Sequence, residues 1–107
     1  MHDNFFELVY SAVAQVPYGK VTTYSAVARF LNNPRGSRAV GWAMRQCPHP
    51  DVPCHRVIKA DGSVGGYGGE GVSKKASLLR KEGVRIRNGK IELAKYMFTN
   101  FKLPKFN

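Results

Sequence analysis

Apolar residues recur at steps of three and four positions near the start of the chain, as they do along one face of an amphipathic helix. The residues concerned are Phe5, Leu8, Val9, Ala12, Val13 and Val16. This pattern predicts a helix from about residue 4 to residue 16, and the turn residues at 17–20 end it. A short extended stretch at 21–23 follows, and Thr23 is a suitable N-cap for a second helix at 24–31.

A turn at 32–36 leads to a third predicted helix at 37–46, so that about 23–46 has the layout of a helix-turn-helix. Its inward face would carry Val40, Ala43 and Met44, and its opposite face Arg38, Trp42 and Arg45, with Gly41 at the edge. Small residues and arginines suit close approach to a DNA backbone better than base readout. A short surface helix with small residues for tight packing fits the pattern equally well.

The second half of the chain predicts shorter elements. The proline-rich stretch 47–53 cannot continue a helix. A strand is predicted at 56–59 and a tight turn at 60–63. Five of the seven residues at 65–71 are glycine, which predicts a loop able to act as a flap, with Tyr67 as its one large side chain.

The C-terminal third combines a helix with a hairpin. Ser73 would cap a helix over about 74–82, and Gly83 would stop it. Alternating apolar residues on both sides of Asn88-Gly89 predict a hairpin over 84–93. The aromatic and basic residues after Ala94 either dock on the core or form a basic tail.

Charge narrows the choice of partner. The chain has 17 Lys and Arg against 7 Asp and Glu, a net charge of +10 that favours nucleic acid as the first candidate partner. An anionic membrane surface is the second candidate, but no apolar stretch has spanning length and no signal peptide is recognisable. We therefore expect an intracellular protein, cytoplasmic and nucleoid-associated or nuclear depending on its source.

Reactive side chains concentrate at Cys54-His55-Arg56, directly after Pro53. A lone cysteine is commonly a small buried hydrophobe, whereas cationic neighbours or a paired histidine would lower its pKa and favour the thiolate. Neighbours in sequence need not be neighbours in space, because in a strand His55 would point away from Cys54. Both interpretations of Cys54 therefore stay open. A disulfide with Cys47 is not expected in an intracellular protein.

The sequence favours neither a zinc site nor a phosphate-binding loop. Cys47, His49, Cys54 and His55 are spaced unlike the common zinc motifs, and adjacent ligands at 54 and 55 would strain a tetrahedral site, so no metal is expected. The glycine run lacks the Gly-Lys-Ser/Thr ending of a P-loop. No cofactor is expected.

Residues 53–57, Pro-Cys-His-Arg-Val, closely resemble the active-site signature of the O6-alkylguanine-DNA alkyltransferases, also called methylated-DNA–protein-cysteine methyltransferases. Further blocks in the family order lie at 19–24, 33–34, 37–41, 43–45, 62–67 and 78–83. The resemblance covers roughly residues 4–87.

The resemblance implies an α/β (α+β), winged-helix-like domain with a helix-turn-helix and short β-hairpins, bound to duplex DNA in the minor groove. A damaged guanine would be flipped out, and its O6-alkyl group transferred irreversibly to Cys54, one group per molecule. His55 would deprotonate Cys54 through a water, and Glu82 would orient the imidazole. Tyr24 would crowd the flipped nucleotide's phosphate and donate to the guanine, and Arg38 would fill the gap in the base stack.

By the same resemblance, the base pocket would be lined by Met44, the Val57 carbonyl, Tyr67 and the Gly68 amide. The DNA-facing residues would be Ser37, Arg38, Gly41, Trp42 and Arg45. The chain departs from the family pattern at three positions: Cys47 replaces an asparagine, Gly68 replaces the serine of some members, and Trp42 replaces a small residue.

The complete expectation is a monomeric single domain over 1–107. It comprises the helix-turn-helix, an active-site loop at 47–58, the glycine-rich flap at 65–71, and the hairpin and tail at 84–107. Larger members of the family carry an additional N-terminal domain that this sequence does not include. The alternatives are a non-catalytic alkyltransferase-like protein that binds O6-alkylguanine and signals to other repair pathways, and a winged-helix module with an inert Cys54. Alkyltransferase-like proteins usually have tryptophan where this chain has Cys54.

Overall fold

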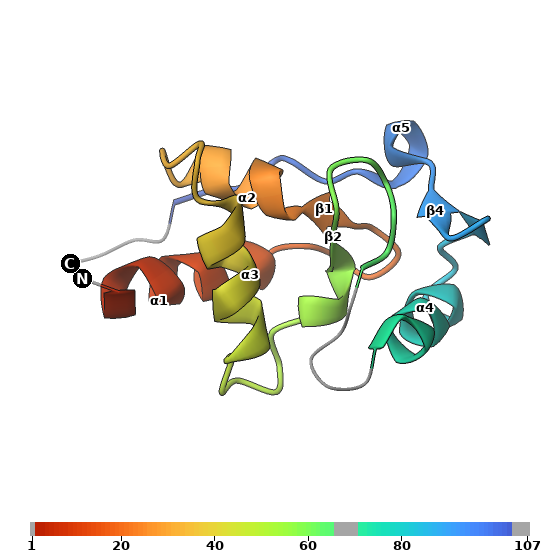
Figure 1. The fold of residues 1–107 in the computed structure, drawn as a ribbon, viewed down its shortest axis with the longest axis horizontal. Helices are drawn as coiled ribbons and strands as arrows, with labels where there is room; N and C mark the ends of the chain where they lie inside the picture. Colours follow the sequence, from red (N-terminus) through yellow and green to blue (C-terminus); the bar gives the residue numbers. More distant parts are fainter. Residues whose placement is uncertain (1, 66–70, 104–107) are drawn as a thin grey trace.

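A computed structural model describes residues 2–65 and 71–103. The elements in order are α1 (His2–Val13), β1 (Thr22–Thr23), α2 (Tyr24–Phe30), α3 (Ser37–Arg45), the 3-10 helix η1 (Cys54–Arg56), β2 (Val57–Ile58), α4 (Gly71–Lys81), β3 (Ile86–Arg87), β4 (Lys90–Ile91) and α5 (Leu93–Tyr96). This mixture of helices and short strands confirms the predicted α+β class. Figure 1 shows α1, α2 and α3 gathered in one half of the molecule, and α4, the hairpin and α5 in the other.

Strand β2 lies between two hydrophobic clusters. The first cluster joins α1, α2 and α3 and includes Val57; the second joins β1, α4 and the hairpin region and includes Ile58. Consecutive residues of a strand point to opposite faces, so the two residues of β2 enter different clusters. Strand β1 pairs with β2 in parallel, with Thr22 opposite Val57. One short strand therefore connects the two halves of the interior.

The predicted helices of the first half are confirmed, with ends that differ by a few residues. Helix α1 ends at Val13, and two further turn hydrogen bonds continue to Val16. The Thr23 side chain accepts from the Ala26 amide at 3.0 Å, as expected for the N-cap of α2. In α3, Val40 and Ala43 are fully buried, whereas Trp42 is 54% exposed, which confirms the predicted faces.

Two predictions about the second half are wrong in detail. Ser73 does not cap α4, because the helix already begins at Gly71, whose φ of +80° suits glycine. The strand predicted at 56–59 is confined to Val57–Ile58, since Arg56 belongs to η1 and Lys59 to the turn. The strand is short because the 3-10 turn before it and the turn at 59–63 leave only two residues to pair with β1.

The hairpin forms, and the tail residues 97–101 pack against the rest of the molecule. Strands β3 and β4 are antiparallel around Asn88 and Gly89, which both have positive φ, confirming the predicted Asn-Gly turn. The tail docks, which settles the alternative left open by the sequence. Met97 bridges to Val21, and the Phe98 amide donates to the Val21 carbonyl at 2.7 Å. Phe101 packs against the first cluster and lies 5.2 Å from the Phe30 ring, centroid to centroid.

Within the described ranges, no helix combines the length and the apolar character that a membrane crossing requires.

Candidate functional site

The residues Cys54, His55 and Arg56 form the single turn η1 directly after Pro53. The Cys54 amide donates to the Val52 carbonyl at 2.8 Å, and the Arg56 amide to the Pro53 carbonyl at 2.9 Å. A 3-10 helix has three residues per turn, so three consecutive side chains spread in different directions. Local geometry thus separates the thiol from its two sequence neighbours.

Glu82 gathers the other two side chains of this turn. Its carboxylate accepts from His55 Nε2 at 2.7 Å and from Arg56 Nε and Nη2 at 2.8 Å each. The Gly19 amide adds a fourth donor at 3.3 Å, and the φ of +84° at Gly19 favours glycine there. Residues 19, 55, 56 and 82 therefore form one hydrogen-bonded cluster, which we call the Glu82 cluster.

The Glu82 cluster fixes the charge and the tautomer at the site. Burial alone would raise the pKa of Glu82, but hydrogen bonds from Arg56 and His55 and from the Gly19 amide lower it to about 2. A carboxylate at neutral pH can only accept hydrogen bonds, which assigns the proton to His55 Nε2. Proton acceptance by neutral His55 would then have to occur at Nδ1.

Arg56 binds Glu82 and the backbone, and it does not act as a charge beside the Cys54 thiol. Besides its two bonds to Glu82, it donates from Nη1 to the Val16 carbonyl at 2.8 Å. Its guanidinium also lies 5.8 Å from the centre of the Tyr18 ring. Arg56 therefore joins η1 to α4 and to the end of the first helical segment, and its charge is matched by Glu82 rather than directed at Cys54.

The thiol of Cys54 is held in its protonated form. Burial raises its pKa to about 12, with additional contributions from the charge and hydrogen bonding of Cys47. This direction is opposite to the lowering that neighbouring His55 and Arg56 would have produced. A backbone hydrogen bond and the charge of Lys75 act the other way. Cys47 and Cys54 are both free thiols.

Lys75 is a buried cation that the sequence did not reveal as part of the site. It lies in α4 with 1% of its surface exposed, and its Nζ donates to the Tyr24 hydroxyl at 3.2 Å. Burial lowers the pKa of Lys75 to about 8, although the charge of Cys54 acts to raise it. Burial also raises the pKa of Tyr24, with a further contribution from Cys54. In the sequence, Lys75 follows Lys74, and such a pair of lysines is typical of the exposed face of a helix. Only the packing of α4 shows that Lys75 is buried.

A groove of about 390 Å³ opens on the face made by α2, α3 and the turn after β2. Its lining includes four predicted site residues: Tyr24, Ser37, Arg38 and Gly41. Lys59 and Ala60 from the turn form the other side. Tyr24 therefore connects this groove to Lys75, and through Lys75 to the surroundings of Cys54.

The remaining predicted pocket and DNA-facing residues do not line this groove or fall outside the described ranges. Trp42 and Arg45 are exposed on α3, but they do not line the groove. Met44 packs against the first hydrophobic cluster, and Val57 is buried in β2. Tyr67 and Gly68, in the predicted flap, fall outside the described residues.

In the two described ranges, no three His, Cys, Asp or Glu side chains gather closely enough to hold a metal ion. Of the four side chains considered as zinc ligands, Cys47 and Cys54 interact with each other, whereas the two histidines have separate partners. His49 faces Glu7 at 3.6 Å, whereas His55 faces Glu82.

Comparison with known proteins places this arrangement in context. The family described as "6-O-methylguanine DNA methyltransferase, DNA binding domain" matches residues 4–84. A bifunctional methyltransferase/endonuclease of Picrophilus torridus is 39% identical over 92% of this chain and 33% of its own length. The methylated-DNA--protein-cysteine methyltransferase of Rattus norvegicus is 40% identical over 73% of this chain and 38% of its own length. The chain thus spans about a third of these two relatives.

Solved structures resemble the fold over more of their length. Atl1 of S. pombe, in complex with damaged DNA containing O6-carboxymethylguanine, has a TM-score of 0.81 and 38% identity, covering 90% of this chain and 95% of Atl1. Mycobacterium tuberculosis OGT in complex with DNA has a TM-score of 0.69 and 41% identity, covering 74% of this chain and 49% of OGT. With most of its length matched by the family and by these neighbours, the chain belongs to the 6-O-methylguanine DNA methyltransferase family.

Proposed function

We propose that this protein repairs duplex DNA by transferring an alkyl group from O6-alkylguanine to its own Cys54. The observation that carries the proposal is the hydrogen bond from His55 Nε2 to Glu82, on the same turn that bears the cysteine. A nucleophile, a base and a group that orients the base recur in nucleophilic catalysis. Membership of the family supports the substrate class.

The chemistry is a displacement at the alkyl carbon. The Cys54 sulfur forms a bond to that carbon as the bond from carbon to O6 breaks, and the thiol proton passes to His55, through a water where one intervenes. The electron pair released at O6 enters the guanine ring, which takes up a proton and becomes unmodified guanine. Cys54 becomes a stable thioether, so each molecule reacts once.

Because Cys54 is buried, its thiol has to be deprotonated when the damaged DNA binds. With a pKa of about 12, the thiol is protonated at neutral pH in the free protein. Removal of its proton by His55, together with the positive charge of Lys75, would provide the activation that the mere adjacency of His55 and Arg56 in the sequence does not. The Tyr24 hydroxyl accepts a hydrogen bond from Lys75, and its own proton would be donated to the departing guanine.

DNA would approach the groove between α3 and the turn after β2. Arg38 lines this groove and is exposed, so it is available to occupy the space left by a flipped base. Ser37 and Gly41 present little bulk beside it, which suits a narrow minor groove. The net charge of +10 would strengthen binding to any duplex through its phosphates.

The second candidate function is lesion binding without transfer. It is favoured by the similarity to "Alkyltransferase-like protein 1" of Schizosaccharomyces pombe, which is 38% identical over 90% of this chain and 95% of its own length. The raised pKa of Cys54 is also compatible with a thiol that does not react. Against it stands the cysteine itself, at the position where proteins of that type usually have tryptophan.

Intact mass spectrometry after incubation with duplex DNA containing O6-methylguanine separates these functions. A gain of one methyl group that maps to Cys54, is absent from Cys47 and is lost in Cys54→Ser supports transfer. Lesion-selective binding without a mass change would contradict alkyl transfer and support lesion binding as the function. Equal affinity for damaged and undamaged DNA, again without a mass change, would leave a plain DNA-binding module.

A further inference from the structure

A basic pocket of about 300 Å³ lies at the hairpin and α5, on elements that carry none of the residues assigned above to the reaction. Four cations line it, Arg85, Arg87, Lys90 and Lys95, together with a single carboxylate, Glu92. Figure 1 shows the hairpin and α5 at the end of the molecule away from α1 and α3. We call this the hairpin pocket.

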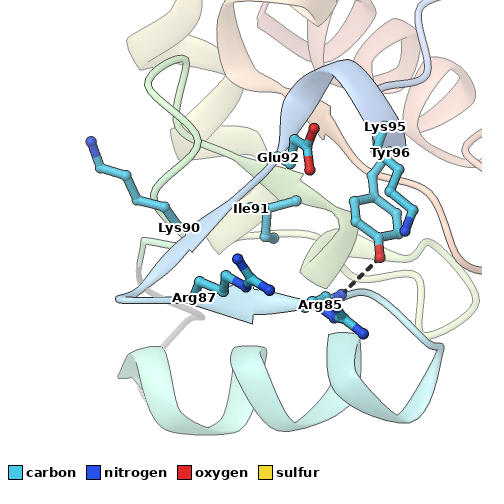
Figure 2. A pocket seen from close by; sticks show the side chains of 7 residues that line it. All are labelled: Arg85, Arg87, Lys90, Ile91, Glu92, Lys95 and Tyr96. Carbon is cyan, nitrogen blue, oxygen red and sulfur yellow. Dashed lines mark hydrogen bonds between the residues drawn. The ribbon is translucent and has the colours of Figure 1, made fainter.

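The hairpin sequence explains why the cations gather on one surface. Val84 and Ile86 alternate with Arg85 and Arg87, and the apolar residues face the second hydrophobic cluster. Period-two alternation therefore turns both arginines outward on the same face. Figure 2 shows the arginines along β3 and Lys95 with Tyr96 across from them, whereas Lys90 extends away.

The arrangement is unfavourable without an anion. Arg87 lies directly opposite Lys90 in the β3–β4 register, and like charges in such a pair destabilise a hairpin. Among residues 2–65 and 71–103, none of the four cations forms an ion pair, and neither does Glu92. The lining carries four positive charges against one negative charge, and although Asp61 interacts with Lys90 from outside the lining, a local positive excess remains that attracts anionic groups.

The side chains also offer directed hydrogen bonds. A guanidinium presents a planar fork that matches the oxygens of a phosphate. The Tyr96 hydroxyl accepts from the Arg85 amide at 3.2 Å, so its own proton remains to be donated to an incoming oxygen. Lys95 Nζ lies 5.4 Å from the centre of the Tyr96 ring, which holds the ammonium at the edge of the pocket.

We propose that the hairpin pocket binds phosphates of a nucleic-acid backbone, as a second contact separate from the α3 groove. This contact adds affinity without sequence or lesion selectivity, because it addresses only the backbone. It is independent of alkyl transfer, so it is tested by DNA binding alone and stands or falls separately from the reaction at Cys54.

The test measures how DNA affinity depends on salt. The double variant Arg87→Gln/Lys95→Gln is compared with the unaltered protein on an undamaged duplex of about 24 base pairs. Each phosphate contact adds about 0.9 to the slope of log affinity against log salt, so the double variant should lower the slope by roughly 1.8. The matched control Lys81→Gln/Lys102→Gln removes two exposed cations outside the hairpin pocket and the groove, and should change the slope much less.

Two results would overturn the proposal. An unchanged slope in the double variant would show that the pocket does not contact the DNA backbone. An equal decrease in the double variant and the control would show that the slope depends only on the net charge of the protein. A thermal midpoint that is not lowered in the variants excludes a loss of folding as the cause. Sodium triphosphate serves as the free-phosphate probe, followed by NMR shifts of residues 85–96. If the pocket binds triphosphate but the salt dependence of DNA affinity is unchanged in the double variant, its ligand is a free anion and not nucleic acid. That result would likewise overturn the proposal.

Discussion

The buried ammonium of Lys75 donates a hydrogen bond to the hydroxyl of Tyr24 over 3.2 Å, joining the middle of α4 to the start of α2. Burying a lysine costs free energy, because burial disfavours its charged form. A lysine in such a place is therefore expected to have a function that offsets this cost. Its pKa of about 8 keeps most molecules protonated at neutral pH. The task we infer is to stabilise the Cys54 thiolate while holding the tyrosine.

Replacing Lys75 by Met should separate stability from reactivity. Met fills a similar volume without charge, so the free energy of unfolding should stay equal or rise by about 1 kcal/mol. The pKa of Cys54 should rise further, and thiol alkylation at a given pH should slow by about tenfold for each unit of that rise. Iodoacetamide labelling of Cys54 against pH, read by mass spectrometry, measures the second effect. Lys81→Met, exposed on the same helix, is the control; equal slowing in both variants would contradict a specific role.

Replacing Cys47 by Asn should make Cys54 more reactive. Cys47 raises the pKa of Cys54 through its charge and through a hydrogen bond. An asparagine at position 47 cannot ionise, so the contribution from charge would be lost. Labelling of Cys54 near pH 8 should accelerate by about tenfold if its pKa falls by one unit. Cys47→Ala tests the removal of the thiol alone. If neither variant changes the labelling rate, Cys47 does not influence the nucleophile.

The Glu82 cluster predicts a specific loss of stability in acid. The pKa of Glu82 is lowered from 4.5 to about 2 in the folded protein, so its contribution is fully present above pH 4.5. It is lost as pH falls from 4.5 towards 2, on the order of 2 kcal/mol. The thermal midpoint measured across this interval should fall more steeply than in Glu82→Gln, which lacks the titrating group. Parallel curves for the two proteins would mean that Glu82 does not titrate as described.

The groove predicts different roles for two arginines of α3. Arg38 lines the groove, whereas Arg45 is exposed outside it. Arg38→Ala should slow alkyl transfer at saturating DNA by roughly 10- to 100-fold, because a flipped base costs a few kcal/mol to hold. Arg45→Ala should weaken binding and reduce the salt slope by about 0.9 at most, with the saturated rate unchanged. Single-turnover kinetics separate the two parameters, and identical effects would make Arg38 a simple phosphate contact.

Local patterns were sufficient for much of the fold. Helices at the start of the chain follow from three- and four-residue spacing, Thr23 is recognisable as a cap, and Asn88-Gly89 specifies its turn. The parallel pairing of Thr22 with Val57 was not predicted, because it joins segments that are far apart in the sequence. The early start of α4 at Gly71 was missed because a serine further along offered a more usual cap.

The site divides in the same way. Cys54, His55 and Glu82 are predicted site residues that rest on family motifs, and the structure shows the contact between His55 and Glu82. Lys75 could not be found, since its burial depends on how α4 packs against α2. The partner of Arg56 was also missed, because a side chain in a 3-10 turn points away from its sequence neighbours.

The two-residue strand β2 has a consequence for how reactivity is lost on heating. Val57 belongs to one hydrophobic cluster and Ile58 to the other, and Cys54 lies three residues before Val57. Loosening of either cluster therefore releases the same short anchor and displaces the thiol. Cys54 acts as a reporter for both halves of the molecule: its shielding from a small thiol reagent should disappear at the first sub-global opening, whichever half opens first.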